Sequence, residues 1–62
     1  MPDDDRLLDK AELASLLGLS RRTIDRMMAD GTGPPAIRLP NGRRRWRLGD
    51  VRAWVREHRE HE

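Results

Sequence analysis

The chain has 62 residues, a formal net charge of +2 and no cysteine, so it forms one small domain without disulfides or cysteine-based zinc sites. No apolar stretch approaches the ~20 residues that span a bilayer, and the first residues are too acidic for a signal peptide. We therefore expect a cytoplasmic protein that makes no membrane contact.

The charges are segregated along the chain. Residues 21–47 hold eight arginines and two aspartates, a net charge of +6, whereas residues 1–20 carry −3 and residues 48–62 carry −1. A concentrated positive segment between acidic flanks is typical of proteins that bind polyanions, most often nucleic acid. The alternative is a solvated face whose arginines form ion pairs with the acidic flanks.

Two helices are predicted after a flexible acidic tail over residues 1–6. Asp9, with a glutamate three residues later, has the pattern of a capping box, and Gly18 suits the left-handed end of this first helix. The second helix begins after the N-cap Ser20 and ends at Asp30–Gly31. The two helices are therefore joined by a short turn.

A β-hairpin is predicted next, with strands over residues 36–39 and 43–48 and a type I′ turn at Asn41–Gly42. Strand alternation places Arg44, Trp46 and Leu48 on one face and Arg43, Arg45 and Arg47 on the other. A third helix starts at Gly49–Asp50, and residues 59–62 are expected to fray.

This order predicts a mainly α fold with a small β-hairpin, a winged helix-turn-helix (helix-turn-helix-hairpin-helix) over residues 7–58. The first two helices are too short to be stable alone, so the hairpin and the third helix must cover their apolar faces. The expected core consists of Leu13, Ala14, Leu17, Leu19, Ile24, Met27, Ile37, Leu39, Trp46, Leu48, Val51, Trp54 and Val55.

The second helix opens with two cations, although the positive end of a helix dipole favours acidic side chains. In a DNA-binding helix-turn-helix this end enters the major groove, where arginines meet phosphates and guanine edges. The alternative is that Asp25 forms ion pairs with Arg21 and Arg22 within the helix. We favour DNA contact, with Arg21 and Arg22 at base edges, and the predicted site on this helix consists of Ser20, Arg21, Arg22, Thr23 and Arg26.

The hairpin carries a second group of cations beside its turn, Arg43, Arg44 and Arg45. A small arginine-bearing turn suits phosphate contact and entry into a minor groove. The alternative is an exposed strand edge that charge keeps soluble. We favour DNA contact for this wing.

The stretch from Leu7 to Val55 resembles the excisionase/AlpA group of small MerR-like winged-helix DNA-binding proteins. The segments LLDKAELA, GLSRRTIDRM, RRRWR and DVRAW carry the resemblance. It implies that the second helix enters the major groove and that the hairpin touches the flanking minor groove. The sequence departs from the group at Gly49, where such proteins often have a serine-type cap.

Members of this group have two kinds of function. Excisionases bind and bend phage or mobile-element attachment sites and direct integrase toward excision, whereas AlpA-like members regulate transcription. Because the sequence shows no long dimerisation helix or sensor domain, we favour an excisionase that is monomeric in solution. We expect cooperative head-to-tail binding to repeated double-stranded DNA sites in the bacterial nucleoid, and the acidic ends are candidate contacts for integrase.

Other function classes have weaker support. An RNA binder needs exposed aromatic side chains for base stacking, and Trp46 and Trp54 fall at core positions. A protein-interaction adaptor with this fold is the remaining binding alternative. His58 and His61 lack a third metal ligand nearby, and no nucleophile–base pair is evident, so we expect no enzyme activity, no metal and no cofactor.

Overall fold

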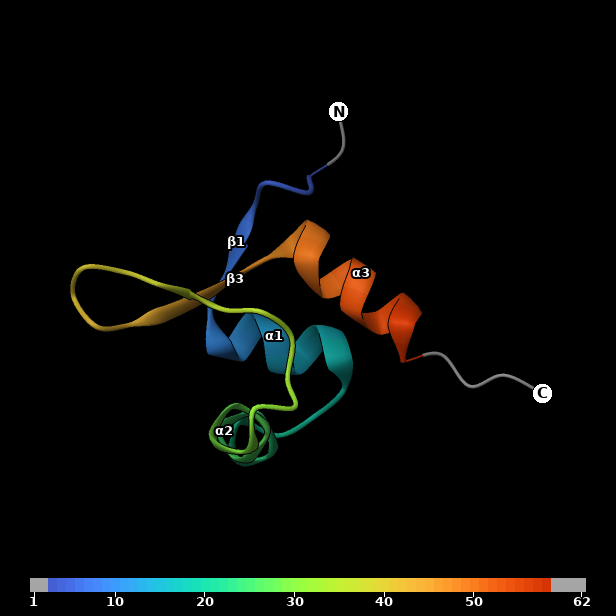
Figure 1. The fold of residues 1–62 in the computed structure, drawn as a ribbon, viewed down its shortest axis with the longest axis horizontal. Coiled ribbons are helices and arrows are strands. Elements are labelled where there is room, and N and C mark those ends of the chain that lie inside the picture. The colour runs from blue at the N-terminus through green and yellow to red at the C-terminus, as the bar shows by residue number, and fades with distance from the viewer. Residues whose placement is uncertain (1–2, 59–62) are drawn as a thin grey trace.

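The computed structural model describes residues 3–58, and its elements follow the predicted order with one added strand. The elements are β1 (Leu7–Leu8), α1 (Lys10–Leu17), α2 (Arg21–Asp30), β2 (Ile37–Arg38), β3 (Arg44–Arg47) and α3 (Leu48–Glu57). The strands form one antiparallel sheet in the order β1-β3-β2. In Figure 1, α1 lies across the view, α2 is seen end-on below it, and the β2–β3 hairpin extends away from the helices. The mainly α fold with a small β wing is confirmed; the frayed end predicted at residues 59–62 lies outside the described residues.

Both ends of α1 and the start of α2 have the caps that the sequence predicts. Asp9 Oδ1 accepts a hydrogen bond from the Glu12 N–H at 2.7 Å, and Glu12 Oε1 accepts one from the Asp9 N–H at 3.2 Å. Ser20 Oγ accepts from the Thr23 N–H at 3.1 Å. Gly18 has a φ of 68°, in the left-handed region that side chains disfavour. Both helix ends at this turn are therefore determined locally.

The turn of the hairpin is not the predicted type I′ turn at Asn41–Gly42. Leu39 O accepts a hydrogen bond from the Gly42 N–H at 2.9 Å, and the Leu39 N–H donates to Arg43 O at 2.7 Å. Within this turn only Gly42 has a positive φ, 84°, whereas type I′ requires a positive φ at both central residues. Pro40 fixes its own φ near −65°, which suits the second position of a type I turn. The loop therefore has three residues, a type I turn followed by a left-handed glycine.

The segment before β1 caps α3 with its backbone. The Leu48 N–H donates to the Arg6 carbonyl and the Gly49 N–H donates to the Asp4 carbonyl, both at 2.9 Å. The first N–H groups of a helix have no partner within the helix, so these two carbonyls replace a side-chain cap. As a result α3 begins at Leu48, one residue before the predicted start at Gly49–Asp50.

For residues 3–6, the part of the predicted flexible tail that the structure describes, the structure differs from that prediction. Residues 3–6 form a turn against the start of α3, and the Asp4 carboxylate binds Arg52 at 3.0 Å. These two residues are 48 positions apart, and the strand β1 that follows pairs with β3, which is also far along the chain. No local pattern in the sequence signals such contacts.

The core lies where α1, α2 and α3 meet the sheet, and it consists of Leu8, Leu13, Ala14, Ile24, Trp46, Leu48 and Val51. All of these except Leu8 belong to the predicted core. Four further predicted members are half-buried, namely Leu17, Met27, Leu39 and Trp54. Six of the thirteen predicted core residues are therefore confirmed as buried, and four more are partly covered.

Three predicted core residues are wrong, because Leu19 and Ile37 are each 37% exposed and Val55 is 46% exposed. The sheet register places Ile37 opposite Arg45, on the face that points away from the core. Val55 lies in the second half of α3, which extends beyond the sheet (Figure 1). Leu19 lies in the tight turn between α1 and α2, where it is only partly covered.

Candidate nucleic-acid interface

The start of α2 presents unpaired arginines to solvent. Arg21, Arg22 and Arg26 are exposed, and none forms an ion pair within the described part of the chain. Asp25 instead binds Lys10 of α1, with 2.5 Å between Nζ and Oδ1. The alternative in which Asp25 pairs with the first two arginines is therefore wrong, and two cations stand unneutralised at the positive end of the helix dipole.

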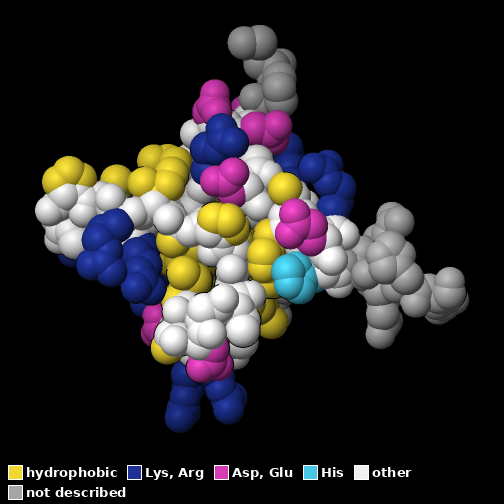
Figure 2. Space-filling view, in the orientation of Figure 1, with side chains coloured by type: hydrophobic (Ala, Val, Ile, Leu, Met, Phe, Trp, Pro, Cys, Tyr) yellow, Lys and Arg dark blue, Asp and Glu magenta, His cyan; other side chains and the backbone are white. Residues whose placement is uncertain are grey.

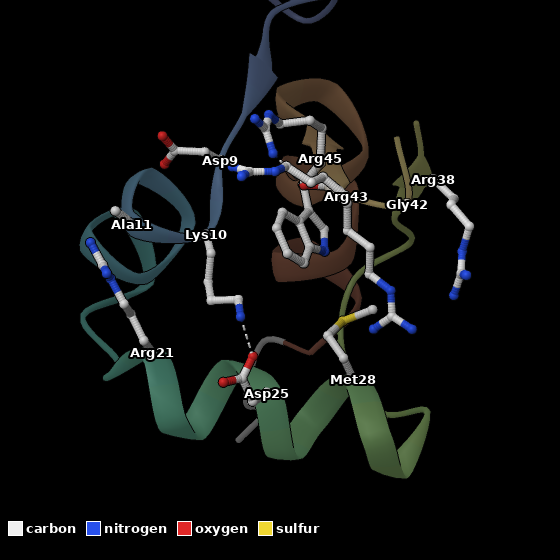
Figure 3. A pocket seen from close by; sticks show the side chains of 12 residues that line it. Asp9, Lys10, Ala11, Arg21, Asp25, Met28, Arg38, Gly42, Arg43 and Arg45 are labelled. Carbon is white, nitrogen blue, oxygen red and sulfur yellow. Dashed lines mark hydrogen bonds and ion pairs between the residues drawn. The ribbon is translucent and has the colours of Figure 1, made fainter. Parts of the chain in front are cut away.

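The predicted contacts on α2 divide between two sides of the helix. Arg22, Thr23 and Arg26 surround a shallow hollow of about 430 Å³. Arg21 instead lines a second, larger hollow, and in Figure 3 its side chain extends from α2 toward α1. Ser20 stands at the junction, because its hydroxyl caps the helix and lies 2.9 Å from the Thr23 hydroxyl. The arginines of α2 thus lie on two different surfaces, with Arg21 on one and Arg22 and Arg26 on the other.

The hairpin arginines lie in β3 and at the residue just before it. Trp46 is 1% exposed and anchors the strand, whereas Arg44 is exposed and Arg45 is half-buried. Arg45 Nη1 donates to the Arg44 carbonyl at 2.9 Å. Arg43 is exposed at the end of the turn, just before the strand. Like those of α2, these three arginines have no ion pair with any described residue.

A hollow of about 660 Å³ separates α2 from the hairpin, and arginines from both elements border it (Figure 3). Arg21 borders it on the helix side, and Arg38, Arg43, Arg44 and Arg45 border it on the hairpin side. Sequence reasoning assigned no role to Arg38. Its position in the first strand of the predicted hairpin was the available signal in the sequence. The pairing of Arg38 with Arg44 follows from the three-residue turn that the structure shows. Arg21 of α2 and the hairpin cations therefore share one hollow, whereas Arg22 and Arg26 line the other.

The remaining cations of the described chain are mostly neutralised by acidic residues. Arg47 binds Asp5 at 2.8 Å and Asp50 at 3.3 Å, and hydrogen bonds and charge from Asp50 and then Asp5 raise its pKa above the ordinary value. Arg6 binds Glu12. In Figure 2 the acidic side chains concentrate around the N-terminal segment, and dark-blue side chains project from α2 and below the hairpin. The acidic flanks therefore neutralise the opposite part of the molecule and leave the positive field on α2 and the hairpin.

The two aromatic side chains do not form a base-stacking surface. Trp46 is fully buried, and Trp54 is half-buried with its ring centroid 4.3 Å from that of His58. The predicted alternative of an RNA or single-strand binder relies on exposed aromatic rings, so the structure gives it no support. The indole N–H of Trp46 has no hydrogen-bond partner among the described residues.

The fold and this surface define a class of protein, the helix-turn-helix proteins whose second helix is flanked by a β-hairpin wing. The sequence profile of the Helix-turn-helix domain family matches residues 7–59, and the chain belongs to this family. Membership makes it a DNA-binding protein, and domains of this family are typically not enzymes. No curated protein matches the chain significantly. Within residues 3–58 no helix has the length and apolar character needed to cross a membrane.

Proposed function

We propose that the protein recognises specific sequences in duplex DNA, with the start of α2 in the major groove and the hairpin at the flanking minor groove. The observation that carries this proposal is that Arg21 of α2 and the hairpin arginines border one hollow, and that neither they nor Arg22 and Arg26 form an ion pair with a described residue. In isolation such like charges repel one another, and a run of phosphates removes that cost. A structural role for these arginines is not evident, because none forms an ion pair with a described residue.

In this proposal the α2 side chains have different tasks. Arg21 and Arg22, in the first turn, reach base edges, where a bidentate contact to guanine contributes about 1–3 kcal/mol of discrimination. Arg26, one turn later, contacts a base or a phosphate. The hydroxyl groups of Ser20 and Thr23 lie beside the first helical turn, where they are placed for phosphate oxygens.

The hairpin supplies shape recognition. Arg43, Arg44 and Arg45 follow a turn of three residues, which is small enough to approach a narrow minor groove. Arginine is attracted to the negative potential of such a groove, and proteins that bind there commonly bend the duplex. Bending is the property that separates an architectural DNA binder from a simple reader of sequence.

We further propose that this architecture serves excision: the protein acts as an excisionase that bends attachment-site DNA and directs integrase toward excision. The family to which the chain belongs includes excisionase-like proteins, which supports this choice. Copies bind repeated sites cooperatively from a monomeric pool, and acidic residues outside the DNA surface are available to contact integrase. An AlpA-like transcriptional regulator is the alternative outcome of the experiment below.

The experiment selects binding sites from a random duplex pool and then moves the selected site along fragments of constant length. Electrophoretic mobility that depends on the position of the site, together with cooperative binding of several copies, is the expected result. Arg56→Ala is the control variant and should bind like the wild type, because Arg56 is exposed on α3, lies outside both hollows and has no ion pair with a described residue. Binding of one copy to straight DNA contradicts the excisionase role and favours the transcriptional regulator. Failure to bind any duplex contradicts the whole proposal.

A further inference from the structure

Two arginines of the hairpin are directly opposite each other on neighbouring strands. The register of β2 and β3 pairs Arg38 with Arg44, so their side chains leave the same face of the sheet. Directly opposed residues in an antiparallel pair have Cβ atoms about 4.5–5.5 Å apart, and like charges in that position are destabilising. Neither arginine has an ion pair with a described residue. Such a pair is well placed to share one anion.

Both arginines line the hollow of about 660 Å³ between the hairpin and α2. Six cationic and two acidic side chains line this hollow, a net charge of +4. The two carboxylates are already occupied, because Asp25 binds Lys10 and Asp9 Oδ1 accepts the Glu12 N–H. The hollow therefore carries a net positive charge, and none of its arginines has an ion pair with a described residue.

The position of the hollow indicates which anion it takes. In the proposed function α2 and the hairpin occupy adjoining grooves of one duplex, and a phosphodiester strand separates the major groove from the minor groove. That strand must pass between the two elements, over the hollow. A planar guanidinium donates two parallel hydrogen bonds to phosphate oxygens, so two opposed arginines hold one phosphate from both sides.

We propose that Arg38 and Arg44 form a clamp for one backbone phosphate of the DNA strand that runs between α2 and the hairpin. This inference rests on the proposed placement of α2 and the hairpin in adjoining grooves. It assigns Arg38 to affinity and to the register of the protein on DNA, with no part in reading bases. Lys10 supports the clamp indirectly, because its ion pair neutralises the Asp25 carboxylate in the same hollow.

The test measures binding of Arg38→Ala to a selected duplex and to an unrelated duplex by fluorescence anisotropy, with Arg56→Ala as control. We expect Arg38→Ala to weaken binding to both duplexes by the same factor. Losing one phosphate contact reduces the slope of log K against log salt by about 0.9. Between 50 and 200 mM salt the wild-type affinity then falls about 3.5-fold more than that of the variant.

A second measurement locates the phosphate. Single neutral methylphosphonates are introduced along the strand, and the position at which Arg38→Ala no longer weakens binding marks the clamped phosphate. The melting temperature of Arg38→Ala without DNA should equal or exceed that of the wild type, because a like-charge pair is removed. A variant that melts lower shows that Arg38 has a structural role and overturns the clamp.

The outcomes separate the clamp from the proposed function. If the wild-type protein binds duplex DNA while Arg38→Ala behaves like Arg56→Ala, the clamp is wrong and the proposed function stands. If Arg38→Ala changes the preferred sequence, Arg38 reads a base and the clamp is also wrong. If the wild-type protein binds no duplex, the proposed function fails and the clamp fails with it.

Discussion

Gly49→Ala is the most direct test of the packing between the N-terminal segment and α3. In an ordinary helix this substitution is stabilising by up to about 1 kcal/mol, because alanine has the higher helix propensity. Here a Cβ on residue 49 would lie 2.9 Å from Asp4 Cβ and 3.2 Å from the Asp4 carbonyl oxygen. The segment must move away, and we therefore expect the opposite sign.

The magnitude follows from the contacts that the movement breaks. Two backbone hydrogen bonds hold the segment, from the N–H groups of Leu48 and Gly49, and each contributes about 1 kcal/mol. The exposed ion pair between Asp4 and Arg52 adds little. After subtracting the gain in helix propensity, the net loss is about 1 kcal/mol, which lowers Tm by about 4–8 °C in a domain of this size.

The assay is thermal unfolding followed by far-UV circular dichroism, in the full chain and in a chain without residues 1–5. In the shortened chain the clash is absent, so Gly49→Ala should stabilise α3 by up to about 1 kcal/mol. Asp4→Gly, which removes the nearest clashing atom, offers a second background in which the loss should shrink. A stabilising Gly49→Ala in the full chain would refute the backbone cap. An equal effect in all three backgrounds would refute it as well.

The remaining predictions concern the DNA surface and the core. Arg22→Ala should reduce discrimination between a selected and an unrelated duplex by about 1–3 kcal/mol in competition binding. Arg44→Ala should weaken binding to both alike and flatten the salt dependence, and a loss of discrimination from Arg44→Ala would reverse these roles. Lys10→Ala leaves Asp25 charged beside the phosphates and should weaken binding, whereas adding Asp25→Asn should restore it; no restoration means that Lys10 contacts DNA itself. Trp46→Ala empties the largest fully buried site and should cost about 3–5 kcal/mol in urea denaturation, and a loss below about 1 kcal/mol contradicts its place in the core.

The helix-turn-helix was predictable from the sequence because its boundaries depend on short-range bonds. Asp9 and Ser20 each accept a hydrogen bond from a residue three positions ahead, and Gly18 adopts the left-handed conformation that ends α1. The alternation of β3 likewise identified Trp46 as buried among arginines. The candidate DNA surface on α2 followed from the same local reasoning, because two arginines in a first turn oppose the dipole of their own helix.

Tertiary structure decided the features that join distant parts of the chain. Sequence alone did not show that the acidic segment around Asp4 caps α3, that Asp25 pairs with Lys10, or that Arg38 opposes Arg44. The pairing of Arg38 with Arg44 depends on the type of hairpin turn. The turn follows the backbone preference of Pro40 and is not the type I′ turn that Asn41–Gly42 predicts. Helix caps and side-chain alternation are determined within a few residues, and so the sequence determined them. The partners of charged side chains depend on which surfaces folding brings together, and only the three-dimensional packing decides that.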